Sequence, residues 1–159
     1  TYRMVAFTAA QRGIAIEFPP GHPFNPVPAL RLAIALGRAA PMLPTVRTIF
    51  EFIWKEGRSL ADDWALLCRR LGVTDADALI GNAEVKDRLR ANGDEAIAWG
   101  IYGVPTFAMT PAGAKRPELF WGEDASVMLR AYLADPGLFD SPQMSALDDL
   151  PIAAARKLA

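Results

Sequence analysis

The residues best suited to chemistry lie in the C-terminal third, where Val104 and Pro105 precede a short apolar run. A proline directly before a buried strand cannot donate a hydrogen bond to the sheet, so we expect a bend at Pro105 and a Val104–Pro105 bond that can be cis. A cis bond would turn the N–H and C=O of Val104 away from the sheet, toward an extended ligand. The bend therefore predicts binding of a short, peptide-like molecule.

The second pair of candidates, Glu123 and Asp124, stands at the start of a predicted helix over 125–134. Free N–H groups at a helix start can hold a carboxylate, and the Asp124 carboxylate can hold an ammonium group. An α-amino-acid head group carries both charges and suits this site. The alternative is that Asp124 is an ordinary helix N-cap.

The elements that position these candidates are short. Two β-type runs, 106–109 and 118–121, flank a turn-rich 110–117 and predict a hairpin with a long loop. A lone hairpin is marginal in water unless something packs on it. The tail, 135–159, contains three prolines and is expected to wrap the surface or be mobile.

The upstream part has a helical pattern. Apolar spacing, prolines and glycines predict helices over 2–12 and 27–37 and a helix that begins at Asn82. Between them, apolar residues at helical spacing over 46–54 predict a further helix, for which Gly57 is the stop. Hydroxyl-to-carboxylate spacing predicts helix-start boxes at Ser59–Asp62 and Thr74–Asp77. Four prolines in 19–26 predict an ordered loop.

Three single residues are the remaining candidates. His22 is the only histidine and has no partner for a metal site, so His22 and Asn25 are expected to satisfy backbone groups of their loop rather than bind substrate directly. Cys68 is the only cysteine, which excludes a dithiol oxidoreductase for this sequence as it stands. Its place on an apolar helical stripe predicts a buried structural thiol.

Composition supports an ordinary globular protein. The chain has 159 residues, of which 52% are hydrophobic and 22% charged, enough for one core or for one core with an insertion. A net charge of −1 gives no reason to expect nucleic acid or an acidic membrane surface as a partner. No apolar run approaches the roughly 20 residues of a membrane span, and no signal peptide opens the sequence, so a cytoplasmic location is expected.

Three segments in order carry a resemblance: His22-Pro-Phe-Asn-Pro26, Gly100-Ile-Tyr-Gly-Val-Pro-Thr-Phe107 and Phe120-Trp-Gly-Glu-Asp124. Together they resemble the 2-hydroxychromene-2-carboxylate isomerase and kappa-class glutathione transferase group of the DsbA-like thioredoxin superfamily. The resemblance covers nearly the whole chain. It implies an α/β, thioredoxin-like (DsbA-like) fold with a large all-helical insertion, in which this chain is mostly helical with a C-terminal ββα unit.

The resemblance also implies site roles. Val104 and Pro105 would hold the cysteinyl backbone of glutathione, Asp124 its γ-glutamyl ammonium, and the loop with His22 and Asn25 would border the substrate cleft. Glu123 replaces the Ser or Asn that is common before this Asp in the family, and its charge would repel the γ-glutamyl carboxylate.

One part of the family pattern is missing from the sequence. The family begins with a βαβ unit whose first turn supplies a Ser to the glutathione sulfur, so this residue is expected upstream of Thr1 and the chain is interpreted as a truncated member. The expected domains are 1–100 (helical insertion and leading helix), 101–135 (ββα part) and 136–159 (tail). An upstream segment, or a second copy in a homodimer, would complete the sheet.

The leading functional hypothesis is therefore a glutathione-dependent isomerase or transferase that acts on small aromatic electrophiles. The thiol would add to the substrate, a bond would rotate, and glutathione would leave. One alternative is a non-catalytic binding or dimerisation module of the same fold. Another is a thiol:disulfide oxidoreductase, if a Cys lies upstream of Thr1.

Overall fold

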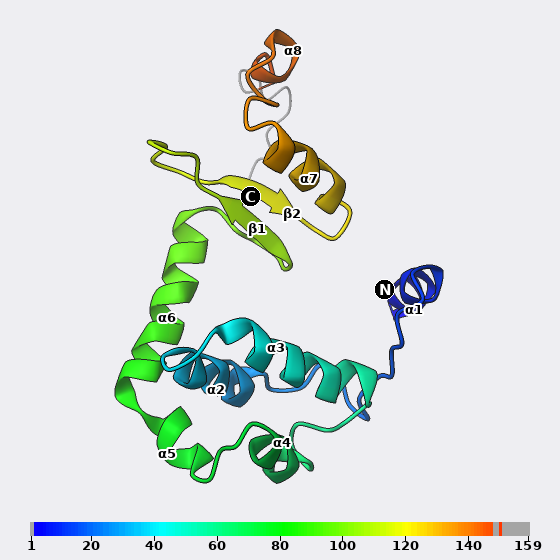
Figure 1. Ribbon diagram of the computed structural model, residues 1–159, viewed down its shortest axis with the longest axis vertical. Helices are drawn as coiled ribbons and strands as arrows, with labels where there is room; N and C mark the ends of the chain where they lie inside the picture. Colours follow the sequence, from blue (N-terminus) through cyan, green and yellow to red (C-terminus); the bar gives the residue numbers. More distant parts are fainter. Residues whose placement is uncertain (1, 148–149, 151–159) are drawn as a thin grey trace, which may run out of the picture. The chain divides into compact units, whose positions relative to one another are not determined.

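The computed structural model describes residues 2–147 and 150, and the chain divides into two compact units, Thr1–Gly93 (unit 1) and Asp94–Ala159 (unit 2). The elements in chain order (Figure 1) are α1 (Tyr2–Gln11), α2 (Val27–Gly37), α3 (Met42–Phe50), the π-helix η1 (Glu51–Lys55), α4 (Trp64–Arg70), α5 (Ala76–Gly81), α6 (Ala83–Ala98), β1 (Thr106–Met109), β2 (Glu118–Trp121), α7 (Ser126–Ala134) and α8 (Pro142–Ser145). The mostly helical chain with a C-terminal ββα unit is as the sequence predicted.

The N-terminal helix confirms the prediction for 2–12. Gly13 has a φ of +65°, a value that glycine adopts without steric cost, and the N–H of Ile14 donates to the C=O of Ala9 over 2.9 Å. This is the six-to-one bond of a Schellman cap, and it ends α1.

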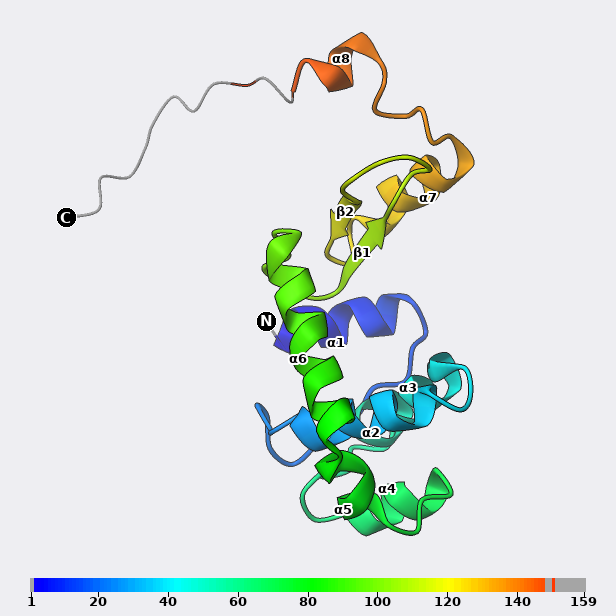
Figure 2. The same cartoon turned by 90° about the vertical axis from the view of Figure 1, so that its left-hand side faces the viewer.

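The core of unit 1 forms between α2 and α3, which lie side by side in both views (Figures 1 and 2). The apolar stripe predicted over 46–54 lies on α3 and η1, which follow each other without a break. Helix α3 begins earlier than the stripe, at Met42, two residues before Pro44, because proline is tolerated in a first turn. The helix then widens into η1, where the N–H of Glu56 donates to the C=O of Glu51. The buried residues of this core are Ala29, Ala33, Ile49, Phe52, Ile53, Leu60 and Leu67.

The two predicted helix-start boxes differ from the contacts that the structure shows. Ser59 Oγ accepts from the N–H of Asp62, but the carboxylate that accepts from the N–H of Ser59 belongs to Asp63. The start of α5 is capped by Asp75, whose side chain accepts from the N–H of Ala78 over 2.9 Å. The box predicted at Thr74–Asp77 was therefore right in place but wrong in the capping residue, whereas Ser59–Asp62 forms a turn and α4 begins only at Trp64, without a side-chain cap.

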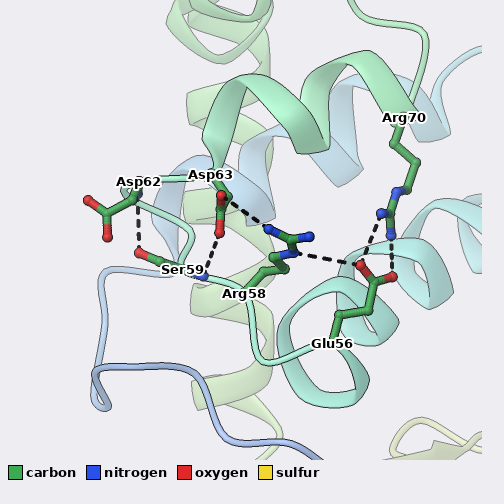
Figure 3. Close-up of polar contacts among 6 residues, drawn as sticks. All are labelled: Glu56, Arg58, Ser59, Asp62, Asp63 and Arg70. Carbon is green, nitrogen blue, oxygen red and sulfur yellow. Dashed lines mark hydrogen bonds and ion pairs between the residues drawn. The ribbon is translucent and has the colours of Figure 1, made fainter.

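Ion pairs join the end of η1 to α4 (Figure 3). The Glu56 carboxylate accepts two hydrogen bonds from Arg70, at 2.5 and 3.0 Å, while Arg58 lies between Glu56 and Asp63. The hydrogen bond from Arg70 lowers the pKa of Glu56 below its ordinary value. The Arg70 guanidinium also stands 5.1 Å from the centre of the Phe52 ring. These contacts hold α4 over the core.

The hairpin of unit 2 has the predicted bounds. Strands β1 and β2 pair antiparallel, with Thr106 opposite Trp121 and Phe107 opposite Phe120. Helix α7 packs against β2 (Figure 2), and Phe120 lies 5.3 Å from the ring of Tyr132, which stacks on Phe139. An aromatic cluster thus supplies the packing that an isolated hairpin lacks. Part of the predicted tail, at 148–149 and 151–159, lies outside the described residues.

Candidate functional site

The bend before β1 has the predicted geometry. The Val104–Pro105 bond is cis, and Val104 is 88% exposed. The N–H of Gly122 donates to the C=O of Pro105 over 2.9 Å, and the Thr106 hydroxyl donates to the C=O of Gly103 over 2.7 Å. The N–H and C=O of Val104 make no hydrogen bond to any residue that the structure describes. The bend is fixed on both sides, and one peptide unit is left open.

The second candidate pair follows β2 directly. Gly122 has a φ of +93°, and a Cβ built on it would collide with the Asp124 carboxylate, so this side chain folds back over the glycine. Helix α7 starts from Ala125 without a side-chain cap, which shows that the alternative of Asp124 as an N-cap was wrong. The C=O of Glu123 accepts from the N–H of Ser126. Asp124 is exposed and available to a cation.

A pair of aromatic rings beside the bend was not foreseen. Tyr102 and Trp121 are 78% and 51% exposed, and their ring centres are 4.9 Å apart. A Cβ on Gly103 would lie 2.5 Å from the indole nitrogen of Trp121, so only glycine lets the ring lie this close. The sequence shows the two aromatic residues but not their proximity, which follows from the hairpin register that places Trp121 opposite Thr106, next to the bend.

The predicted cleft residues belong to unit 1. Asn25 accepts from the N–H of Val27 at the start of α2 over 3.1 Å, which confirms its backbone role. His22 instead bonds a side chain: its Nδ1 lies 2.8 Å from the Tyr2 hydroxyl, and its ring centre lies 5.3 Å from that of Trp54. A substrate role for either residue stays a prediction.

The remaining reactive groups are structural. Cys68 is buried beside Leu32 and Val73, as predicted, and burial raises the pKa of its thiol. The thiolate, which is the nucleophile, is therefore disfavoured. Among residues 2–147 and 150, no group of three His, Cys, Asp or Glu side chains is placed to hold a metal ion.

A comparison with protein-family models identifies the class. The model of the DsbA-like thioredoxin domain matches residues 3–134, so the chain belongs to the DsbA-like thioredoxin domain family. This confirms the resemblance inferred from the three sequence segments. No helix in the described part of the chain is both long and apolar enough to cross a membrane.

Two individual proteins narrow the comparison. The chain is 37% identical over 75 residues to "Glutathione s-transferase kappa 2" of Caenorhabditis elegans, a match that covers 45% of this chain and 33% of that protein. A solved structure of 2-hydroxychromene-2-carboxylate isomerase (HCCA isomerase) superposes with a TM-score of 0.65 at 21% identity, over 92% of this chain and 69% of the isomerase chain. The matched segment thus spans about a third of the curated relative, and the isomerase likeness shows the fold alone.

Proposed function

We propose that unit 2 binds glutathione and that the protein to which this chain belongs is a glutathione-dependent transferase or isomerase. The observation that carries the proposal is the open peptide unit of Val104 beside the cis proline. An extended peptide can pair with such a unit as if it were one more strand. The similarity to a kappa-class glutathione transferase supports glutathione as that peptide.

The charged end of glutathione provides the second contact in this proposal. Its γ-glutamyl ammonium pairs with the exposed Asp124 carboxylate, and its α-carboxylate accepts from N–H groups at the start of α7. The negative charge of Glu123 repels this α-carboxylate and lowers the affinity for glutathione. We therefore expect glutathione to bind more weakly here than at a site with a neutral residue in that position.

The proposed chemistry is redox-neutral. The glutathione thiolate adds to a conjugated carbon of a small aromatic electrophile and forms a C–S bond; the former double bond rotates; the C–S bond then breaks and returns the electron pair to sulfur. Loss of the electrophile's own leaving group instead of sulfur gives transfer. A homodimer is part of the proposal, as the assembly that would cover the exposed face of the hairpin.

The proposal is tested by calorimetric titration of glutathione into the full chain and its Asp124→Asn variant. Losing a charge-assisted contact is expected to weaken binding roughly tenfold. Asp140→Asn is the matched control, because Asp140 is an exposed aspartate of the same unit away from the bend.

A second ligand distinguishes the contact at Val104 from the contact at Asp124. The dipeptide Cys-Gly lacks the γ-glutamyl group, so its weaker binding should not change in Asp124→Asn. Unchanged glutathione affinity in that variant would remove Asp124 from the site, and absence of glutathione binding to the unaltered chain would overturn the proposed function.

A further inference from the structure

Unit 1 contains a cavity of about 440 Å³ where residues of α2, α3 and α6 meet. This volume is within the range of about 300–1,000 Å³ that is usual for small-molecule sites. Its lining consists of Ile34, Gly37, Arg38, Met42, Glu84, Val85, Arg88 and Asn92. None of these residues belongs to the proposed glutathione site, so binding in the cavity can be tested separately from glutathione binding.

Apolar side chains line part of the cavity. Ile34 and Val85 are buried, and Met42 packs over Gly37, where an added Cβ would lie 2.8 Å from the methionine methyl carbon. The absence of a side chain at Gly37 thus makes room for Met42 in the wall. An apolar molecule placed here removes this surface from water, which favours binding by about 25 cal/mol per Å².

The polar lining carries an unbalanced positive charge. Arg38 forms an ion pair with Glu84, with 2.5 Å between nitrogen and oxygen. Arg88, one turn after Glu84, forms no ion pair with any residue that the structure describes, and Asn92 follows one turn later on α6. Two guanidiniums against one carboxylate leave one positive charge, with a side-chain amide beside it.

From this arrangement we propose that the cavity binds a small monocarboxylate with an apolar, aromatic-sized body. The carboxylate accepts two hydrogen bonds from the Arg88 guanidinium, the geometry at which arginine is strongest, and Asn92 donates a third. The apolar body lies on Ile34, Val85 and Met42. The Glu84 carboxylate disfavours phosphates and dicarboxylates, because a second negative charge would be repelled.

The experiment is a calorimetric titration of 2-naphthoate into the full chain at low salt, with Arg88→Gln as the variant. Loss of the charge-assisted pair is expected to weaken binding at least tenfold. Arg90→Gln is the matched control, since Arg90 is an exposed arginine on the same helix that does not line the cavity, and its affinity should stay within twofold. Equal far-UV circular dichroism melting curves show that both variants fold.

The neutral amide of naphthoic acid is the second ligand. It should bind at least tenfold more weakly than the acid to the unaltered chain, and Arg88→Gln should not weaken it further. The proposal is overturned if naphthoate does not saturate the chain at millimolar concentration, if both arginine variants lose affinity equally, or if the amide binds as well as the acid.

Discussion

Gly122 is the residue at which backbone geometry and binding chemistry meet in unit 2. Its positive φ turns the chain between β2 and α7, and its missing side chain leaves the space that the Asp124 carboxylate occupies. Its N–H also fixes the C=O of Pro105. One glycine thus connects the bend and the carboxylate, the two halves of the candidate site.

Gly122→Ala should therefore impair both stability and binding. Holding alanine at this φ costs about 1–2 kcal/mol of unfolding free energy, and its Cβ would displace the Asp124 carboxylate and weaken glutathione binding. Gly113→Ala is the control: Gly113 has a φ of +82° but nothing within 4 Å of the added Cβ. It should lose similar stability in urea titrations and keep its affinity. Equal affinities in the two variants would contradict this role.

At the same scale, the sequence predicted some contacts and missed others for physical reasons. The bend at Pro105 was predictable because proline lacks a donor, a local property. The bond between His22 and the Tyr2 hydroxyl was not, because it joins residues 20 positions apart. The proximity of Tyr102 to Trp121 likewise depends on hairpin register, which emerges only when both strands are paired.

At the scale of elements, the sequence patterns that predict helices and strands were more reliable than those that predict which residue caps a helix. Strands β1 and β2 have the predicted bounds because the turn-rich loop interrupts two clear β-type runs. The segments 59–63 and 74–77 each contain one hydroxyl residue and two aspartates, so several side chains in each can accept from a backbone N–H. The choice among them depends on how α4 and α5 pack, which spacing does not reveal.

The cap that the structure selects can be tested at α5. Asp75→Ala should lower the unfolding free energy by about 1 kcal/mol, because the N–H of Ala78 loses its acceptor. Asp62→Ala is the matched control, since only the backbone N–H of Asp62 takes part in the turn at Ser59. Its unfolding free energy, measured by urea titration, should change by less than about 0.5 kcal/mol. A larger loss in Asp62→Ala than in Asp75→Ala would contradict this assignment.

For the whole molecule, the main feature is that each unit has its own core. Unit 1 is built around Phe52 and Leu67, which are fully buried, and unit 2 around Phe120 with Tyr132. The sequence predicted a helical part followed by a ββα part, and the division between the units falls within α6. The predicted boundary at 100 was placed at the end of that helix, where glycines follow; the structure divides after Gly93, a glycine that does not interrupt the helix.

Separate cores predict separate responses to core mutations. Phe52→Ala should cost unit 1 about 3–5 kcal/mol and accelerate amide hydrogen exchange in α2 and α3, with little change in β1 and β2. Phe120→Ala should do the reverse. Hydrogen exchange followed by mass spectrometry measures both. Acceleration across both units by either variant would show a single cooperative structure.

The number of residues in the helix formed by α3 and η1 determines which way Trp54 points. Because the wide turn takes up one extra residue, removing one residue from the 51–55 stretch would restore regular α-helical bonding and leave the two ends of the helix close to their present rotation. Inserting one residue into the regular part of α3 would instead turn Trp54 by about 100° about the helix axis and carry its ring away from Phe18 and His22, whose rings it now contacts. The longer chain would keep its composition and hydropathy almost unchanged but lose the ring cluster that anchors the proline-rich loop.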